Sequence, residues 1–89
     1  MTKRNARISN KLGLHARASA KLTKLAASFE CDVHMSRNGR RINAKSIMGV
    51  MMLAAGLGTD VEIETDGPDE QQALAAIVAL IDDKFGEGQ

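Results

Sequence analysis

The stretch CDVHMSRNGRRINA, residues 31–44, decides the fold. Residues 31–37 alternate apolar and polar side chains, which predicts a strand with one buried face. Asn38-Gly39 follows, and this pair favours a two-residue turn whose central positions both need a positive φ. Residues 40–44 are then expected to return beside the first strand. The stretch therefore predicts an antiparallel hairpin, two neighbouring strands of a sheet.

Two more strands are predicted away from this hairpin. Residues 3–9 alternate around Ala6 and Ile8, and residues 60–66 (DVEIETD) alternate apolar or Thr positions with acids. Both patterns have the period of two that a half-buried strand requires.

Three segments have helical character. The first starts at Ala16 and carries one apolar stripe: Ala18, Leu22, Leu25 and Phe29. The second covers residues 47–55, with Ser46 as N-cap and Gly56 as a stop signal. The third begins near Pro68 and ends at Gly86, and its apolar face carries Ala73, Leu74, Ile77, Leu80, Ile81 and Phe85. The predicted order is βαββαβα, an α+β domain over residues 1–89 whose helices cover one face of an antiparallel sheet.

Composition excludes several classes of protein. The chain has 89 residues, is 44% hydrophobic and 26% charged, and has no Trp or Tyr. That balance fits one globular domain rather than a disordered chain. The single Cys31 excludes an internal disulfide and favours a reducing, cytoplasmic setting. The apolar stretch 47–57 is about half the length that a membrane span needs, so no membrane insertion is expected.

The near-zero net charge of +1 hides a split along the chain. Residues 1–45 hold 11 Lys and Arg against Glu30 and Asp32, whereas residues 46–89 hold nine acids against Lys84. The first half thus carries a net +9 and the second −8. Such segregation makes a basic surface for an acidic partner possible. Arg17, Lys21 and Lys24 form a cationic stripe beside the apolar stripe of the first helix.

The segment Gly13-Leu14-His15-Ala16-Arg17 is the first candidate site. His15 falls at or next to the N-cap, where the first backbone N–H groups of a helix are unpaired and carry the positive end of its dipole. A helix start of this kind stabilises phosphate, and a guanidinium at Arg17 adds a bidentate partner. A neutral imidazole there can accept a phosphoryl group. The structural alternative is a surface histidine beside a solvated arginine.

Ser46 and the helix behind it form the second candidate site. Ile47, Val50, Met51 and Ala54 are expected to be buried, leaving Met48, Met52 and Ala55 partly exposed. Exposed methionines make an adaptable contact surface. Phosphate on Ser46 would add negative charge that the helix start tolerates and an apolar or acidic partner does not. The alternatives are a purely structural cap and a loop that covers the methionines.

Other chemistries find little support. Cys31 and His34 point to opposite faces of their strand, so no metal site is expected, and no cofactor motif occurs. No acid–base carboxylate pair is expected near His15, because the acids lie mostly in the second half, and this argues against a self-contained enzyme. Nucleic-acid binding by this element order relies on sheet aromatics, which are missing here. A dimeric small-molecule regulatory domain would need a glycine-rich loop, and only Gly56-Leu57-Gly58 hints at one.

The two candidate sites carry a resemblance. Residues 10–17 (NKLGLHAR) and 43–51 (NAKSIMGVM) look like the motifs of the HPr family, the small phosphocarriers of the bacterial phosphoenolpyruvate-dependent sugar phosphotransferase system. The resemblance covers essentially the whole chain. It implies an open-faced β-sandwich in which three helices cover one face of a four-stranded antiparallel sheet. A reduced or nitrogen-linked phosphotransferase system with mainly regulatory output is the alternative setting.

The resemblance also implies roles and partners. His15 would accept phosphate on Nδ1 from enzyme I and pass it to enzyme IIA domains, supported by Arg17 and the backbone of Ala16 and Arg17. Ser46 would be the target of HPr kinase/phosphorylase. Docking residues would be Leu14, Lys21, Lys24, Ile47, Met48 and Met51, on a monomer. Ala18 stands where the family usually has proline, and alanine suits that helical turn equally.

Overall fold

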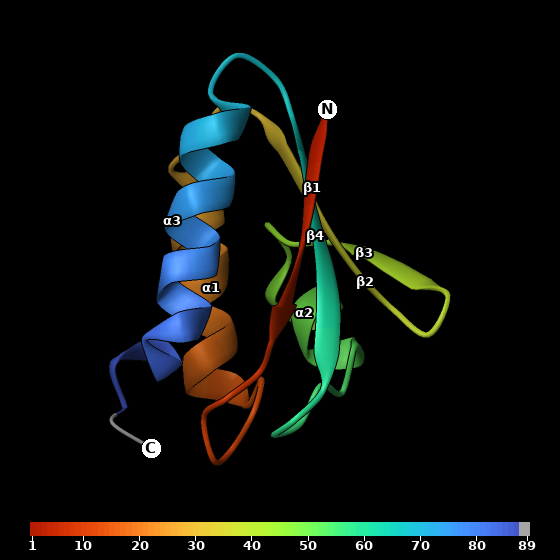
Figure 1. Ribbon diagram of the computed structural model, residues 1–89, viewed down its shortest axis with the longest axis vertical. Coiled ribbons are helices and arrows are strands. Elements are labelled where there is room, and N and C mark those ends of the chain that lie inside the picture. Colours follow the sequence, from red (N-terminus) through yellow and green to blue (C-terminus); the bar gives the residue numbers. More distant parts are fainter. Residues whose placement is uncertain (88–89) are drawn as a thin grey trace.

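Four antiparallel strands form one sheet in the order β1-β4-β2-β3, and the helices lie on one side of it (Figure 1). The computed structural model describes residues 1–87. Its strands are β1 (Thr2–Arg7), β2 (Asp32–Arg37), β3 (Arg40–Asn43) and β4 (Asp60–Asp66), and its helices are α1 (Ala16–Ala27), α2 (Ile47–Met52), α3 (Glu70–Asp82) and the short 3₁₀ helix η1 (Lys84–Gly86). The predicted α+β class, element order and open-faced arrangement are confirmed.

The β2–β3 hairpin forms as its sequence predicts. Asn38 and Gly39 have φ values of 51° and 79°, the left-handed conformations that the turn requires. In the sheet, Met35 of β2 lies opposite Ile42 of β3 and Ile63 of β4. This row of apolar side chains continues the buried face across three strands, which fixes the register of the whole sheet.

The core lies between this face and helices α1 and α3. Helix α1 buries Ala18, Leu22 and Ala26 completely. Leu25 and Phe29 are partly buried and pack against this core, and Phe29 lies beyond the helix, which ends at Ala27. The predicted apolar stripe therefore matches α1 as far as Leu25, and its last residue, Phe29, lies outside the helix.

The last helix is shorter than predicted. Helix α3 ends at Asp82, and the chain turns through positive φ values at Lys84 and Phe85. Phe85 is still fully buried, since this turn folds its ring back under the helix end.

At the start of α3, the Asp69 carboxylate accepts hydrogen bonds from the backbone N–H groups of Glu30 and Cys31, both at 2.9 Å. These bonds hold the pKa of Asp69 below its usual value and tie the start of α3 to the start of β2.

Helix α2 differs most from its prediction. It ends at Met52 rather than residue 55, and Ala54 then takes a φ of 52°. Val50 is buried within the helix, and Leu53, the residue after its end, is buried too. These two residues are three positions apart and lie on the same side, so they form the inner side of this short helix. Consequently Ile47, Met51 and Ala54 are exposed where burial was expected, and Ala55 is buried where exposure was expected.

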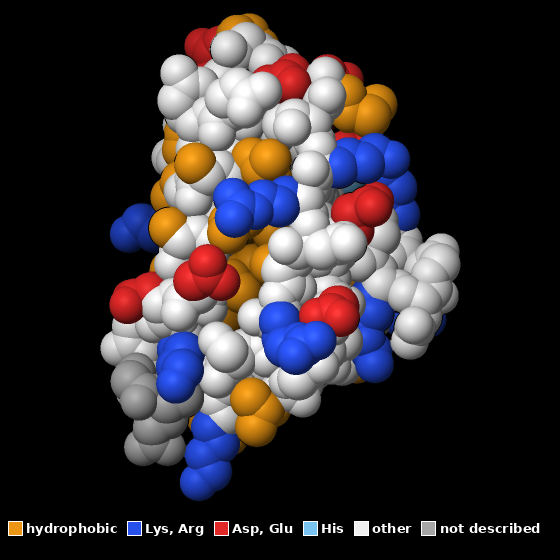
Figure 2. All heavy atoms as spheres, in the orientation of Figure 1, with side chains coloured by type: hydrophobic (Ala, Val, Ile, Leu, Met, Phe, Trp, Pro, Cys, Tyr) orange, Lys and Arg blue, Asp and Glu red, His pale blue; other side chains and the backbone are white. Residues whose placement is uncertain are grey.

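The sheet intermixes the two charged halves of the sequence. Basic β1 pairs with acidic β4, so that Lys3 lies opposite Glu64 and Arg7 opposite Asp60. The Arg7 Nε to Asp60 Oδ1 distance is 3.1 Å, and Arg41 of β3 donates to the Glu64 carboxylate at 2.9 Å. On the face drawn in Figure 2, blue and red side chains accordingly alternate over the strands. Lys3, Arg7 and Arg41 are therefore paired with acids of β4 on the sheet, whereas Arg17, Lys21 and Lys24 lie on α1.

Among the helices of residues 1–87, none has both the length and the apolar character that crossing a membrane demands.

Candidate functional site

The loop between β1 and α1 is fixed against the segment that follows α2. The Leu14 N–H donates to the Ala55 carbonyl at 2.9 Å. Gly13 has a φ of 64°, and a Cβ added there would lie 2.6 Å from the Ala55 oxygen. A residue with a side chain would therefore both strain the backbone and push the two segments apart. The loop that carries His15 is thus held against the segment that directly follows α2, the helix that Ser46 begins.

His15 is the N-cap of α1, as predicted. Its backbone is extended, with φ −75° and ψ 179°, and no side chain caps the helix start. Ala16 and Arg17, which provide the first N–H groups of the helix, are both exposed. These unpaired donors lie at the positive end of the helix dipole, so this helix start can receive an anion from solvent.

The imidazole of His15 lies between two oxygen acceptors. Its Nδ1 is 3.0 Å from the Gly13 carbonyl oxygen, and its Nε2 is 3.0 Å from Oε2 of Glu87. A carbonyl oxygen only accepts, so Nδ1 is the donor to Gly13 in this arrangement. The side chain of His15 is 28% exposed, which leaves the ring accessible at the surface.

Asn10 closes a ring of contacts around the histidine. Its Nδ2 donates to the Gly13 carbonyl at 2.8 Å and to Glu87 Oε1 at 3.0 Å. Asn10 is completely buried, and its Oδ1 has no hydrogen-bond partner among residues 1–87. Asn10 therefore links the His15 loop to the C-terminal segment and orients the Glu87 carboxylate toward the ring.

One carboxylate, that of Glu87, lies beside His15, and the sequence patterns did not point to it. The segment after α3 is anchored by buried Phe85, whose carbonyl accepts from Lys21 Nζ at 2.6 Å. This anchoring brings the C-terminal turn back to the start of α1. No helix or strand pattern in the sequence includes Glu87. A count of acids along the chain also does not show that the turn after α3 folds back to the start of α1.

Arg17 and Ser46 occupy the positions that the sequence predicts. Arg17 is exposed beside His15, and within residues 1–87 its guanidinium makes no hydrogen bond or ion pair. Ser46 is the N-cap of α2, and its Oγ accepts from the Gly49 N–H at 3.2 Å. Ser46 is also exposed. Its hydroxyl is therefore a structural cap that remains accessible.

The predicted docking residues are not equivalent. Ile47, Met48, Met51 and Lys24 are exposed, as a contact surface requires. Leu14, in contrast, is only 6% exposed and belongs to the core, because the bond from its N–H to Ala55 draws the loop inward. Lys21 is bound to the Phe85 carbonyl and so has a structural task as well. Sequence analysis missed two exposed apolar residues of the same region, Leu12 and Leu57.

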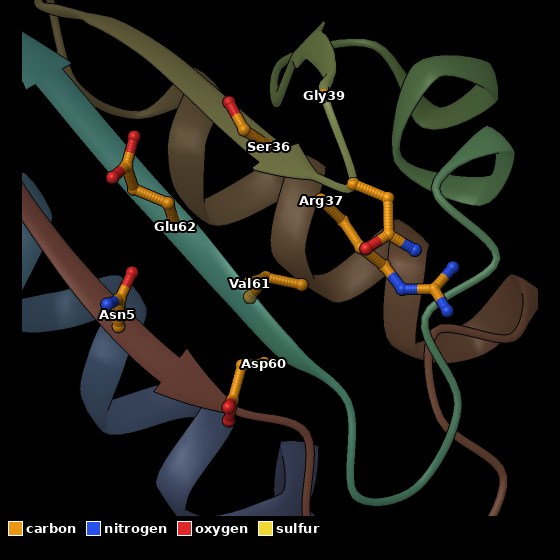
Figure 3. Close-up of a pocket in the computed structure, with 8 residues that line it drawn as sticks. Asn5, Ser36, Arg37, Gly39, Asp60, Val61 and Glu62 are labelled. Atoms are coloured by element: carbon orange, nitrogen blue, oxygen red, sulfur yellow. The ribbon is translucent and has the colours of Figure 1, made fainter.

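A hollow of about 270 Å³ lies over the strands, on the side of the sheet that the helices leave open (Figure 3). Its wall comes from β1, β4 and the β2–β3 turn, and includes Asn5, Arg37 and Asp60. Asp60 is already paired with Arg7. Within residues 1–87, no group of His, Cys, Asp and Glu side chains is suited to hold a metal ion. The hollow thus lacks the chemistry that surrounds His15.

Comparisons with known proteins agree on one family. Residues 2–83 match the family model described as the PTS HPr component phosphorylation site. The chain is 66% identical to the phosphocarrier protein HPr of Cupriavidus necator, over 100% of both chains. It superposes on the crystal structure of HPr-C-His from Thermoanaerobacter tengcongensis with a TM-score of 0.95, at 40% identity and 98% coverage of both chains. An HPr dimer from the same organism gives a TM-score of 0.79, at 40% identity, over 98% of this chain and 100% of that one.

Proposed function

Because the chain belongs to the HPr family of phosphocarrier proteins of the phosphotransferase system, we propose that His15 carries the phosphoryl group. The donor is enzyme I and the acceptors are enzyme IIA domains. One observation supports this assignment above others: His15 caps α1 beside exposed, unpaired N–H groups and the exposed Arg17. The protein is a carrier rather than an enzyme, and the reaction needs no cofactor from it.

The transfer is a displacement at phosphorus between two imidazoles. A ring nitrogen of His15 attacks the phosphorus of the donor phosphohistidine, a new N–P bond forms, and the N–P bond on the donor breaks. In the resting arrangement Nδ1 donates to the Gly13 carbonyl. Attack needs the lone pair of Nδ1, so we propose that docking releases Nδ1 from Gly13 and that Nδ1 gives up its proton to solvent. The neutral ring then keeps its one proton on Nε2, where it donates to Glu87. The phosphoryl oxygens then meet the N–H groups of Ala16 and Arg17 and the Arg17 guanidinium.

Glu87 has a part in the same step. When Nδ1 takes up the phosphoryl group, the ring gains positive charge that it shares with Nε2–H. Glu87 Oε2 lies 3.0 Å from Nε2 and can stabilise this charge, as an acidic residue does for histidine in hydrolase triads. Because Asn10 holds the carboxylate in place, little reorganisation is needed at that moment.

Docking is assigned to the exposed residues Ile47, Met48, Met51 and Lys24 around this site. The apolar side chains provide the contact, and the cations of α1 raise the rate of encounter with an acidic partner surface. Ser46 is proposed as the target of HPr kinase/phosphorylase, since it is exposed at the start of the same helix. The working carrier is proposed to be a monomer with one such face.

Incubation with enzyme I and phosphoenolpyruvate tests the assignment. The intact mass should rise by one phosphate, and the adduct should be lost in acid, because phosphohistidine is a phosphoramidate. A control without phosphoenolpyruvate should show no gain. An acid-stable adduct, or no adduct at all, would contradict the proposal.

The Glu87→Gln variant is expected to accept phosphate about tenfold more slowly than the parent. A hydrogen bond to a charged group contributes roughly 1.5 kcal/mol or more, which corresponds to about a factor of ten in rate. The rate of mass gain at a fixed enzyme I concentration measures the effect. The matched control is Asp82→Asn, which removes one negative charge from the exposed end of α3, away from the ring contacts. Equal rates in both variants would show that Glu87 acts only through net charge.

A further inference from the structure

Three methionines of α2 lie at the surface beside the site. Met48, Met51 and Met52 are 67%, 40% and 56% exposed, and we call them the α2 methionine cluster. Met35, in contrast, is completely buried in the sheet. A thioether is apolar and adaptable, which suits a contact surface, but it is also the side chain that two-electron oxidants convert to a sulfoxide.

The fold does not depend on these three side chains. The end of α2 is held by guanidinium groups from the hairpin: Arg40 donates to the Met52 carbonyl at 2.8 Å and Arg37 to the Leu53 carbonyl at 2.9 Å. Its inner side is held by buried Val50 and Leu53. A chemical change at the methionine sulfurs therefore alters the surface and leaves the anchoring of the helix intact.

The cluster is rigidly connected to the phosphoryl acceptor. Ala55, three residues after Met52, accepts from the Leu14 N–H at 2.9 Å, next to His15. The backbone at Gly13 approaches Ala55 and Gly56 too closely for any side chain. We therefore expect a partner docked on His15 to reach this end of α2.

We propose that the α2 methionine cluster is an oxidation site that blocks docking of the phosphoryl donor reversibly. The proposal rests on the function proposed above. The thioether sulfur attacks one oxygen of a hydroperoxide, the O–O bond breaks, and the sulfur gains that oxygen while the peroxide is reduced to water or an alcohol. Sulfur loses two electrons and the peroxide gains them. Thiol-dependent sulfoxide reductases reverse the step.

The sulfoxide changes the contact surface directly. It places a strong hydrogen-bond acceptor where the partner expects an apolar group, and such a polar group is costly to bury without a donor. Two or three sulfoxides on one short helix should slow phosphoryl acceptance at least tenfold at low enzyme I concentration. Cys31 does not compete for the oxidant, since it is buried and burial raises the pKa of its thiol.

Hydrogen peroxide is the probe, and peptide masses locate the oxygen. Met48 and Met52 should oxidise ahead of Met51, and Met35 should remain unmodified. Phosphoryl acceptance from enzyme I is then measured for each protein before and after peroxide, and again after sulfoxide reductase. The control is the triple variant Met48→Leu, Met51→Leu, Met52→Leu, which conserves volume and helix propensity. Each protein is compared with its own untreated sample.

The parent should lose at least tenfold in rate and regain it on reduction, whereas the triple variant should lose less than twofold. Met1 is 68% exposed and stays oxidisable in both proteins, so it reports equal exposure to peroxide. If the untreated parent accepts no phosphate, the proposed function fails. If the untreated parent accepts phosphate and its oxidised form does so equally fast, or if oxidation unfolds it by circular dichroism, the oxidation site is overturned.

Discussion

His15→Ala is expected to abolish phosphoryl acceptance, with a loss of at least a thousandfold in rate. The ring supplies the atom that forms the bond to phosphorus, and within residues 1–87 the only other histidine is His34 on β2. An alanine cannot form the N–P bond, and a serine or lysine nearby would give an adduct of different stability. The measurement is the acid-labile mass gain with enzyme I and phosphoenolpyruvate.

The matched control is His34→Ala. His34 is half-buried on β2, paired in register with Glu64 of β4 and Asn43 of β3, so its loss affects the sheet and not the start of α1. This variant should gain phosphate at nearly the parental rate. If His15→Ala still gained phosphate and His34→Ala did not, the phosphoryl acceptor would be His34 on the sheet.

Ser46→Asp is expected to weaken docking to enzyme I by about ten- to a hundredfold. The substitution places a negative charge beside exposed Ile47 and Met48, within the proposed contact. Desolvating that charge against an apolar or acidic surface costs roughly 1–3 kcal/mol, which gives the stated range in Kd. Titration calorimetry or the dependence of phosphoryl transfer on enzyme I concentration measures it.

Ser46→Ala separates the charge from the cap. Asp caps a helix about as well as Ser, whereas Ala leaves the Gly49 N–H without its acceptor. Ser46→Ala should therefore lower the free energy of unfolding by about 1 kcal/mol and leave docking nearly intact. Ser46→Asp should instead weaken docking and leave the free energy of unfolding nearly unchanged. Parallel effects of the two variants on docking would mean that the cap, rather than the charge, controls the surface.

The local chemistry of the sequence predicts most of this fold. Alternation around Val33 and Met35 and the Asn38-Gly39 turn are short-range signals, and the structure follows them. Where prediction failed, burial depended on distant partners. α2 is too short for its sequence to say which side faces the core, and the hairpin arginines that end it approach from another part of the chain.

The candidate site divides in the same way. The N-cap position of His15 follows from neighbouring residues, and so does the cap at Ser46. Glu87 could not be inferred, because its contact with Asn10 spans 77 positions and depends on how the chain turns after α3. Leu14 illustrates the opposite error: a motif position suggested an exposed residue, and a single backbone bond to Ala55 places it in the core.

The ring formed by Asn10, Gly13, His15 and Glu87 has a consequence for biosynthesis. A chain leaves the ribosome with its N-terminus first. His15 thus emerges before Glu87, whose carboxylate completes its surroundings. A nascent or truncated chain displays the histidine without that partner. Full competence in phosphoryl transfer should therefore be acquired only after Glu87 has been made and the turn that carries it has folded back onto the start of α1.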